Sequence, residues 1–169
     1  SQVQEALSEL SRAAKLSAEV LGAAGVELLD LPDNRLDSLD RLDLIKLIEN
    51  QIDVLQPNTV YVHHCGDVNI DHRRLHEAVV TACRPTPGHP VHRLFSYEVP
   101  SSTEWQPPGS AVAFQPNLFV DISNQWKRKQ QALEAYASEM RSWPHARSLK
   151  AVEYLARLRG ARPCSAGGG

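Results

Sequence analysis

Apolar residues recur along this chain at two kinds of spacing, one typical of helices and one typical of strands. From residue 3 to residue 21 they return at every third or fourth position, which predicts an amphipathic helix that ends at Gly22. The same spacing predicts four further helices, over residues 40–55, 71–83, 124–140 and 149–159. The residues that we expect at their N-caps are Asp40 or Ser38, Asp71, Ser123 or Asn124, and Ser148.

Four shorter apolar runs predict β-strands at residues 26–31, 59–62, 92–99 and 118–122, because they are bounded by glycine, proline or polar clusters. These strands alternate with the predicted helices, a pattern typical of an α/β layered sheet with right-handed crossovers. We therefore expect a single domain over residues 1–160. Residues 161–169 are rich in glycine and other small residues, which predicts a flexible tail.

The second predicted strand leads directly into a cluster of polar residues. Three histidines and two aspartates lie within ten residues, between positions 63 and 72, where the strand ends and a helix begins. Open α/β sheets place their ligands at such strand ends, and these residue types serve as metal ligands and as acids or bases. Each of these residues alone is also explained by turn or cap chemistry.

This stretch reads His63-His64-x-Gly66-Asp67-x-Asn69-x-Asp71-His72. It resembles the third conserved block of the PIG-L/LmbE-like N-acetyl-sugar deacetylases, a family of zinc-dependent enzymes. The similarity runs from about residue 12 to residue 160 and includes residues 31–37, 97–105 and 144–148. It implies a Rossmann-like three-layer α/β/α fold with a mostly parallel sheet. It also implies an amide hydrolase whose substrate is an N-acetylglucosaminyl-type sugar or glycoconjugate.

The resemblance also implies roles for individual residues near the metal. His72 corresponds to a metal ligand of the family, and Asp71 either orients a catalytic group or caps the helix. Asn69 stands where many relatives have a histidine, so it can donate a hydrogen bond but cannot titrate.

Four further residues are candidates for contacts with a sugar. Asp67 and Arg35 are candidates for contacts with sugar hydroxyls, although turn and surface roles explain them equally well. Glu104 and Trp105, in a long polar loop, are candidates for hydrogen bonding and stacking. Trp105 either stacks on a sugar or covers the core.

The family's first block, a strand ending in His-Pro-Asp-Asp-Glu, has no counterpart in this sequence. We therefore expect an N-terminally truncated domain that, as given, does not retain Zn²⁺ and is inactive. We also expect exposed strand edges and a tendency to aggregate. The alternative is a non-catalytic sugar- or nucleotide-sugar-binding module, or a degenerate deacetylase paralogue. A phosphate-binding transferase is disfavoured, since no GxGxxG or GxxxxGKS pattern occurs.

Composition narrows the setting in which the protein works. The formal net charge of −2 over 169 residues gives no reason to expect a nucleic-acid partner. An odd number of cysteines, three, without a CxxC pattern favours a reducing compartment, and we expect the cytoplasm. No apolar run approaches the roughly 20 residues that span a bilayer. Whether the protein forms a homo-oligomer is left open.

Overall fold

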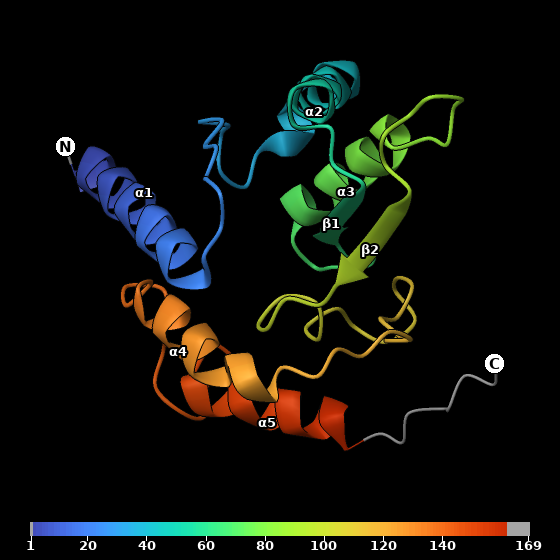
Figure 1. Cartoon of the computed structure of the whole chain (residues 1–169). Coiled ribbons are helices and arrows are strands. Elements are labelled where there is room, and N and C mark those ends of the chain that lie inside the picture. Colours follow the sequence, from blue (N-terminus) through green and yellow to red (C-terminus); the bar gives the residue numbers. More distant parts are fainter. Residues whose placement is uncertain (1, 162–169) are drawn as a thin grey trace. The chain divides into compact units, whose positions relative to one another are not determined.

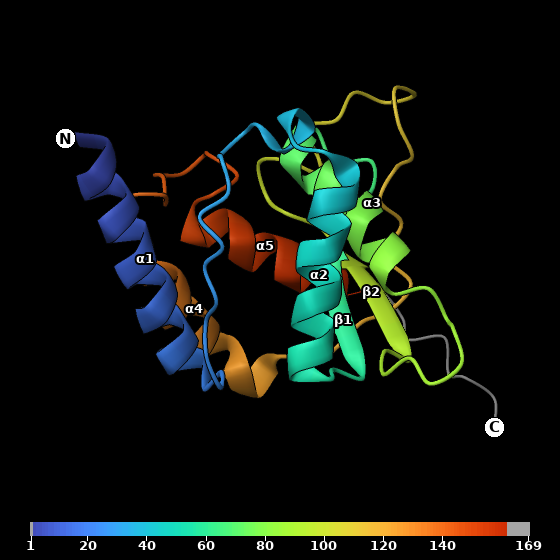
Figure 2. The ribbon, with the colours of Figure 1, turned by 90° about the horizontal axis from the view of Figure 1, so that it is seen from above.

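The computed structural model describes residues 2–161, and the expected flexible tail lies outside them except for Ala161. The chain forms two compact units. We call Leu31–Gln115 the central unit, and the described residues before and after it the flanking unit. Figures 1 and 2 show the ribbon from two directions. The expectation of one domain over residues 1–160 stays a prediction.

The central unit is built on two parallel strands, β1 (Thr59–His63) and β2 (Arg93–Tyr97). Their register pairs Thr59 with Arg93 and His63 with Tyr97, so both strands end at the same edge. The connection between them carries α3 (Ile70–Ala82), which packs against β1. The two strands lie side by side in Figure 1, with α3 next to them. The prediction of an α/β class with parallel pairing is confirmed.

Two helices supply most of the core of the central unit. α2 (Arg41–Leu55) packs against α3, and the short 3₁₀ helix η1 (Leu36–Ser38) also contacts α3. Val62 on β1 is 2% exposed, whereas its neighbour Tyr61 is 64% exposed, as expected when side chains alternate across a strand. The buried residues that join this core are Leu36, Leu44, Ile45, Ile52, Val62, Ala78, Val79, Ala82, Cys83 and Val91. One face of the sheet is therefore covered by helices, and the face of Tyr61 is open.

The N-caps of the central unit agree with the sequence at α2 and differ at α3. The Asp40 side chain accepts the backbone N–H of Leu42, so it caps α2 as predicted. The prediction that Asp71 caps the next helix is wrong, because Asn69 is the N-cap and accepts the backbone N–H of Asp71 at 2.8 Å. The helix thus begins one residue earlier than predicted, at Ile70.

Two of the four predicted strands do not form. Residues 26–31 and 118–122 contain no strand, although both runs are apolar. A strand exists only where a neighbour supplies ladder hydrogen bonds, and neither run has such a neighbour within residues 2–161. Their large side chains stay largely exposed, for example Val120 at 71%. The apolar pattern was therefore not sufficient to make these runs strands.

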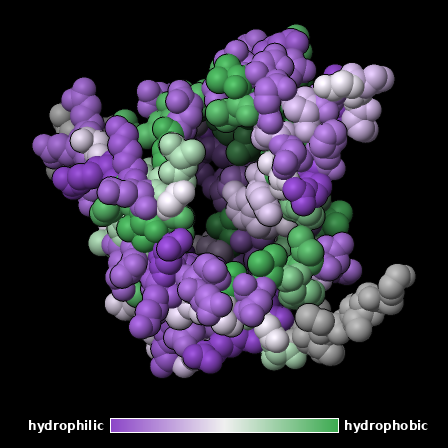
Figure 3. Space-filling model, viewed as in Figure 1, coloured by the Kyte–Doolittle hydropathy of each residue, from purple (hydrophilic) through white to green (hydrophobic). Residues whose placement is uncertain are grey.

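The flanking unit is helical. α1 (Gln2–Leu21) packs against α4 (Trp126–Glu134), with Ala13 and Ala132 buried. The outward side of α1, at the left of Figure 3, is mainly hydrophilic. α5 (Leu149–Gly160) begins at Ser148, whose hydroxyl accepts the backbone N–H of Ala151, so the predicted cap is confirmed.

The start and end of α4 differ from the prediction. Neither Ser123 nor Asn124 caps it, since both lie in the 3₁₀ helix η2 (Ser123–Gln125). The carboxylate of Asp121 accepts both the backbone N–H and the hydroxyl of Ser123, so the Ser123 hydroxyl donates there instead of capping α4. The helix is also shorter than predicted and ends at Glu134.

Candidate functional site

The candidate site lies at the edge where β1 and β2 both end. His63 ends β1 and is paired in register with Tyr97, which ends β2. The loop that follows β1 leads to α3, and the loop that follows β2 contains Ser102 and Thr103. The carboxyl ends of parallel strands are where open α/β sheets bind their ligands.

Asp67 lies at the centre of this edge and is 0% exposed. Its Oδ1 accepts the backbone N–H of Asn69 at 2.9 Å and the hydroxyl of Ser102, and lies 3.1 Å from Nδ1 of His72. Its Oδ2 accepts the hydroxyl of Thr103 at 2.8 Å. Burial raises the pKa of Asp67, but the hydrogen bonds from Ser102, Asn69, Thr103 and His72 together lower it below the usual value. The buried carboxyl is therefore held as an anion.

The contact with Asp67 determines how His72 presents its ring. Because Nδ1 faces an anionic oxygen, this nitrogen carries the hydrogen and donates it. In the neutral ring Nε2 then holds the lone pair, and Nε2 makes no hydrogen bond with any residue in the described part of the chain. Histidines that bind metals commonly donate their other ring N–H to a carboxylate in this way. The His72 ring is therefore arranged as a metal ligand would be.

His63 packs against the face of the His72 ring. The ring centroids are 3.9 Å apart and the planes differ by 14°. Tyr97 places its hydroxyl 3.2 Å from Nε2 of His63, and His76 donates from Nδ1 to the His63 carbonyl at 2.8 Å. Burial, with the nearby His72 and His76, lowers the pKa of His63 to about 4 against the opposing effect of Asp67. His63 is thus a neutral ring that supports His72.

His64 and Gly66 shape the loop after β1 rather than the site itself. Nε2 of His64 donates to the carbonyl of Val112 at 2.8 Å, and its ring meets Phe114 edge to face at 5.3 Å. A Cβ on Gly66 would lie 2.1 Å from the carbonyl oxygen of Val112. Any other residue at this position would therefore force apart the loop that contains Asp67 and the backbone at Val112.

The two residues predicted as catalytic, Asn69 and Asp71, both make local structural contacts. Asn69 caps α3, and its Nδ2 lies 3.4 Å from Oδ1 of Asn34. Oδ1 of Asp71 accepts the backbone N–H of Leu36 at 2.9 Å, across 35 residues of sequence. This bond ties the turn at residues 33–38 to the first turn of α3, next to His72.

The four residues predicted to bind a sugar are placed differently from one another. Asp67 is fully buried and both of its oxygens face protein donors, so it lies behind His72. Arg35 is exposed and precedes Leu36, the residue bound by Asp71. Glu104 accepts the backbone N–H groups of the two residues at 101 and 102, and Trp105 is 53% exposed. Three of the four thus remain at the surface of the central unit.

The comparison with protein families agrees with this geometry. The family model described as PIG-L, GlcNAc-PI de-N-acetylase, matches residues 2–83. Residues 2–83 of this chain are thus similar to the PIG-L family. The predicted family is confirmed, and the parallel α/β arrangement of the central unit is consistent with the LmbE-like fold of PIG-L proteins. A search of curated proteins found no match.

The match places part of the candidate site inside the PIG-L region. Asp67, Asn69, Asp71 and His72 fall within the matched residues, together with β1 and α3. The loop after β2, with Ser102 to Trp105, lies beyond it. In the described part of the chain, no helix combines the length and the apolar composition that spanning a bilayer requires.

Sequence reasoning missed the hydroxyl groups of Ser102 and Thr103. Both residues are buried, at 7% and 8% exposure, and both bind Asp67. Their position in the sequence could have revealed them, because they follow the predicted strand at residues 92–99. That strand was expected to lie parallel to the strand at residues 59–62, which leads to Asp67. Since parallel strands end at one edge, polar residues that follow each of them meet there.

The residues present do not complete a metal site. Within residues 2–161, no group of three or more His, Cys, Asp and Glu side chains is arranged to hold a metal ion. Catalytic zinc takes three protein ligands and a water. The expected ligand His72 supplies one nitrogen within the described residues, Nε2.

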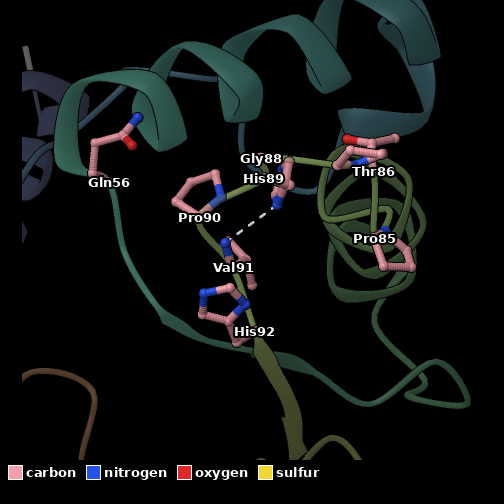
Figure 4. A pocket seen from close by; sticks show the side chains of 9 residues that line it. Gln56, Pro85, Thr86, Gly88, His89, Pro90, Val91 and His92 are labelled. Carbon is pink, nitrogen blue, oxygen red and sulfur yellow. Dashed lines mark hydrogen bonds between the residues drawn. The ribbon is translucent and has the colours of Figure 1, made fainter.

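A separate pocket opens at the other end of the sheet, before β2. It has a volume of about 620 Å³ and is lined by Gln56 and residues 85–92 (Figure 4). One of its two histidines, His89, is used structurally: Nε2 donates to the Ala82 carbonyl at 3.0 Å, and Nδ1 accepts the backbone N–H of Val91 at 3.2 Å. This pocket holds none of the residues of the candidate site.

Proposed function

We propose that the protein is a hydrolase that removes the acetyl group from an N-acetylglucosaminyl-type substrate. The observation that carries this proposal is the buried Asp67 carboxylate 3.1 Å from Nδ1 of His72, which leaves Nε2 available for a metal. The match to a family described as GlcNAc-PI de-N-acetylase supports the reaction class. The compartment that we propose is the cytoplasm.

We further propose that His72 is one ligand of a divalent metal, with zinc as the candidate. Zinc in hydrolases polarises a carbonyl and lowers the pKa of its bound water to about 7. Asp67 orients the ligand ring, His63 supports its face, and Asp71 fixes the neighbouring turn. Because His72 alone among the described residues does not make a zinc site, we propose that this chain by itself neither holds zinc tightly nor hydrolyses substrate.

The exposed residues around the strand ends are proposed to contact the sugar. Trp105 offers an aromatic face in the loop after β2, and aromatic faces stack well on apolar faces of ligands. Arg35 is exposed on the turn that Asp71 ties to α3. Glu104 already accepts two backbone N–H groups, so its first role is to shape the loop that carries Trp105.

Acetate release tests the proposal directly. The protein translated from the whole gene is incubated with zinc and a water-soluble N-acetylglucosaminyl-inositol phosphate. Residues 1–169 alone are incubated in parallel as a second sample. We expect acetate from the first and none from the second. His72→Ala should abolish release, whereas His92→Ala, an exposed histidine by the separate pocket, should leave it unchanged. Equal release by wild type and His72→Ala would overturn the proposed role of His72.

A second candidate function is sugar binding without catalysis. It is favoured by the lack of a three-ligand group in the described residues. It predicts that the complete reading frame binds N-acetylglucosamine in calorimetry, with no acetate released and no zinc in elemental analysis. One tightly held zinc per chain in residues 1–169 would contradict both candidate functions.

A further inference from the structure

We infer that Ser102 and Thr103 are positioning residues that hold the Asp67 carboxylate against His72 and so keep the hydrogen of its neutral ring on Nδ1. The inference rests on the proposed function only for the claim that Nε2 then binds a metal. The arrangement of the hydrogen-bonded groups is a property of the chain itself. It assigns a task to the loop after β2, which lies beyond the region matched by the family.

The Thr103 hydroxyl has both of its roles filled. It donates to Oδ2 of Asp67 at 2.8 Å and accepts the backbone N–H of Val99 at 2.7 Å. Because Val99 supplies the hydrogen on one side, the hydroxyl hydrogen is directed to the carboxylate on the other. Thr103 therefore binds the carboxylate oxygen that His72 does not reach.

Ser102 acts on the side of the carboxylate nearest His72. Its hydroxyl donates to Oδ1 of Asp67, and its oxygen lies 3.4 Å from Nδ1 of His72. Since its single hydrogen goes to the carboxylate, the oxygen presents lone pairs toward the ring. Nδ1 of His72 thus faces two acceptors, a carboxylate and a hydroxyl oxygen, and both favour an N–H at this nitrogen.

The two loops are also joined through their backbones. The N–H of Val68 donates to the Ser102 carbonyl at 3.4 Å, next to the side-chain bonds. The N–H of Asn69 binds Oδ1 of Asp67. The carboxylate is therefore held by donors from both strand-end loops, and rotating it away from His72 would leave buried donors without acceptors.

If the two hydroxyls only held the loops together, they would not affect which nitrogen of the His72 ring carries the hydrogen. The experiment therefore measures the position of that hydrogen. The metal-free chain of residues 1–169 is labelled with ¹⁵N-histidine, and long-range ¹H–¹⁵N NMR identifies the protonated nitrogen at pH about 8.5, above the ordinary histidine pKa of about 6.5. We expect wild-type His72 with its hydrogen on Nδ1. A wild-type ring with its hydrogen on Nε2 would overturn the inference without any variant.

Matched variants then test the two hydroxyls. Ser102→Ala and Thr103→Val remove one hydroxyl each and should shift His72 toward a mixture of the two tautomers. Thr103→Ser keeps the hydroxyl and should retain the wild-type tautomer. Ser101→Ala is the control, because the Ser101 hydroxyl makes no hydrogen bond within the described chain. An unchanged His72 tautomer in both Ser102→Ala and Thr103→Val would overturn the inference, as would a shift in the control.

Zinc affinity of the protein from the complete reading frame separates this inference from the proposed function. If both hold, Ser102→Ala and Thr103→Val weaken zinc binding about 10- to 100-fold, the range seen when a partner of a metal-ligating histidine is lost. A tautomer shift in a protein that binds no zinc would support the positioning role and refute the metal site. Wild-type zinc affinity in both variants would refute the link between the hydroxyls and the metal.

Discussion

Oδ1 of Asp67 lies 3.1 Å from Nδ1 of His72, and the carboxylate that makes this contact is entirely buried. Four donors surround it, so an amide in its place would turn its NH₂ group toward other donors. We expect Asp67→Asn to lower the free energy of unfolding by roughly 2–4 kcal/mol. Urea unfolding measures it, with the exposed Asp37→Asn as the control. A loss below about 0.5 kcal/mol would contradict a fully satisfied buried anion.

Asp71 should matter for the turn that it binds. Its carboxylate accepts the backbone N–H of Leu36, so Asp71→Ala leaves a partly buried donor without an acceptor. We expect a loss of about 1–2 kcal/mol in stability and faster hydrogen exchange at the Leu36 amide. Asp53→Ala, at an exposed position of α2, should change neither quantity. Unchanged exchange at Leu36 in Asp71→Ala would show that this bond does not hold the turn.

Asn69 allows its cap role to be separated from a role in catalysis. Asp caps helices as well as Asn does, so Asn69→Asp should keep the stability of α3, while Asn69→Ala should lose about 1 kcal/mol. Chemical denaturation checks this. If Asn69 also donates a hydrogen bond to substrate, Asn69→Asp in the complete reading frame will lose acetate release at unchanged stability. Equal stability of Asn69→Ala and wild type would contradict the cap.

The two described cysteines should react at very different rates. Cys65 is exposed, whereas Cys83 is buried and burial raises the pKa of its thiol. A raised pKa means a smaller thiolate fraction at any given pH, so the chemistry of Cys83 adds to its burial in slowing its reaction. Iodoacetamide labelling followed by peptide mass spectrometry from pH 7 to pH 9 measures both. Similar rates at pH 8 would mean that α3 is not packed as described.

The open face and edges of the small sheet should make the isolated chain associate. Tyr61 is 64% exposed in the middle of β1, and parallel sheets are normally covered on both faces. We expect Tyr61→Lys to raise the concentration at which residues 1–169 stay monomeric in light scattering. Val54→Lys, which replaces an equally exposed apolar residue on α2, should have little effect. A sharp, reversible melt from a wild-type monomer would contradict this expectation.

The sequence predicts those features of the site that depend on neighbouring residues, and it does not predict those that depend on contacts between distant parts of the chain. The candidate site at residues 63–72 was predicted from the sequence, together with the strand before it and the helix after it. Local apolar spacing and turn residues specify these elements. Residues 26–31 and 118–122 carry the same apolar signal, yet they form no strand. A strand requires a neighbour, and no local pattern reports whether one is present.

The sequence by itself determined the resemblance to the PIG-L family and the helix that carries His72, since periodicity and a short block of residues are local properties. Which apolar runs pair as strands was decided by the tertiary structure. The tertiary structure alone decided that Asp67 is buried behind His72 and that Ser102 and Thr103, 35 and 36 residues further along the chain, donate to it. Those contacts exist because two parallel strands end at one edge. Only the folded chain brings together residues that follow separate strands.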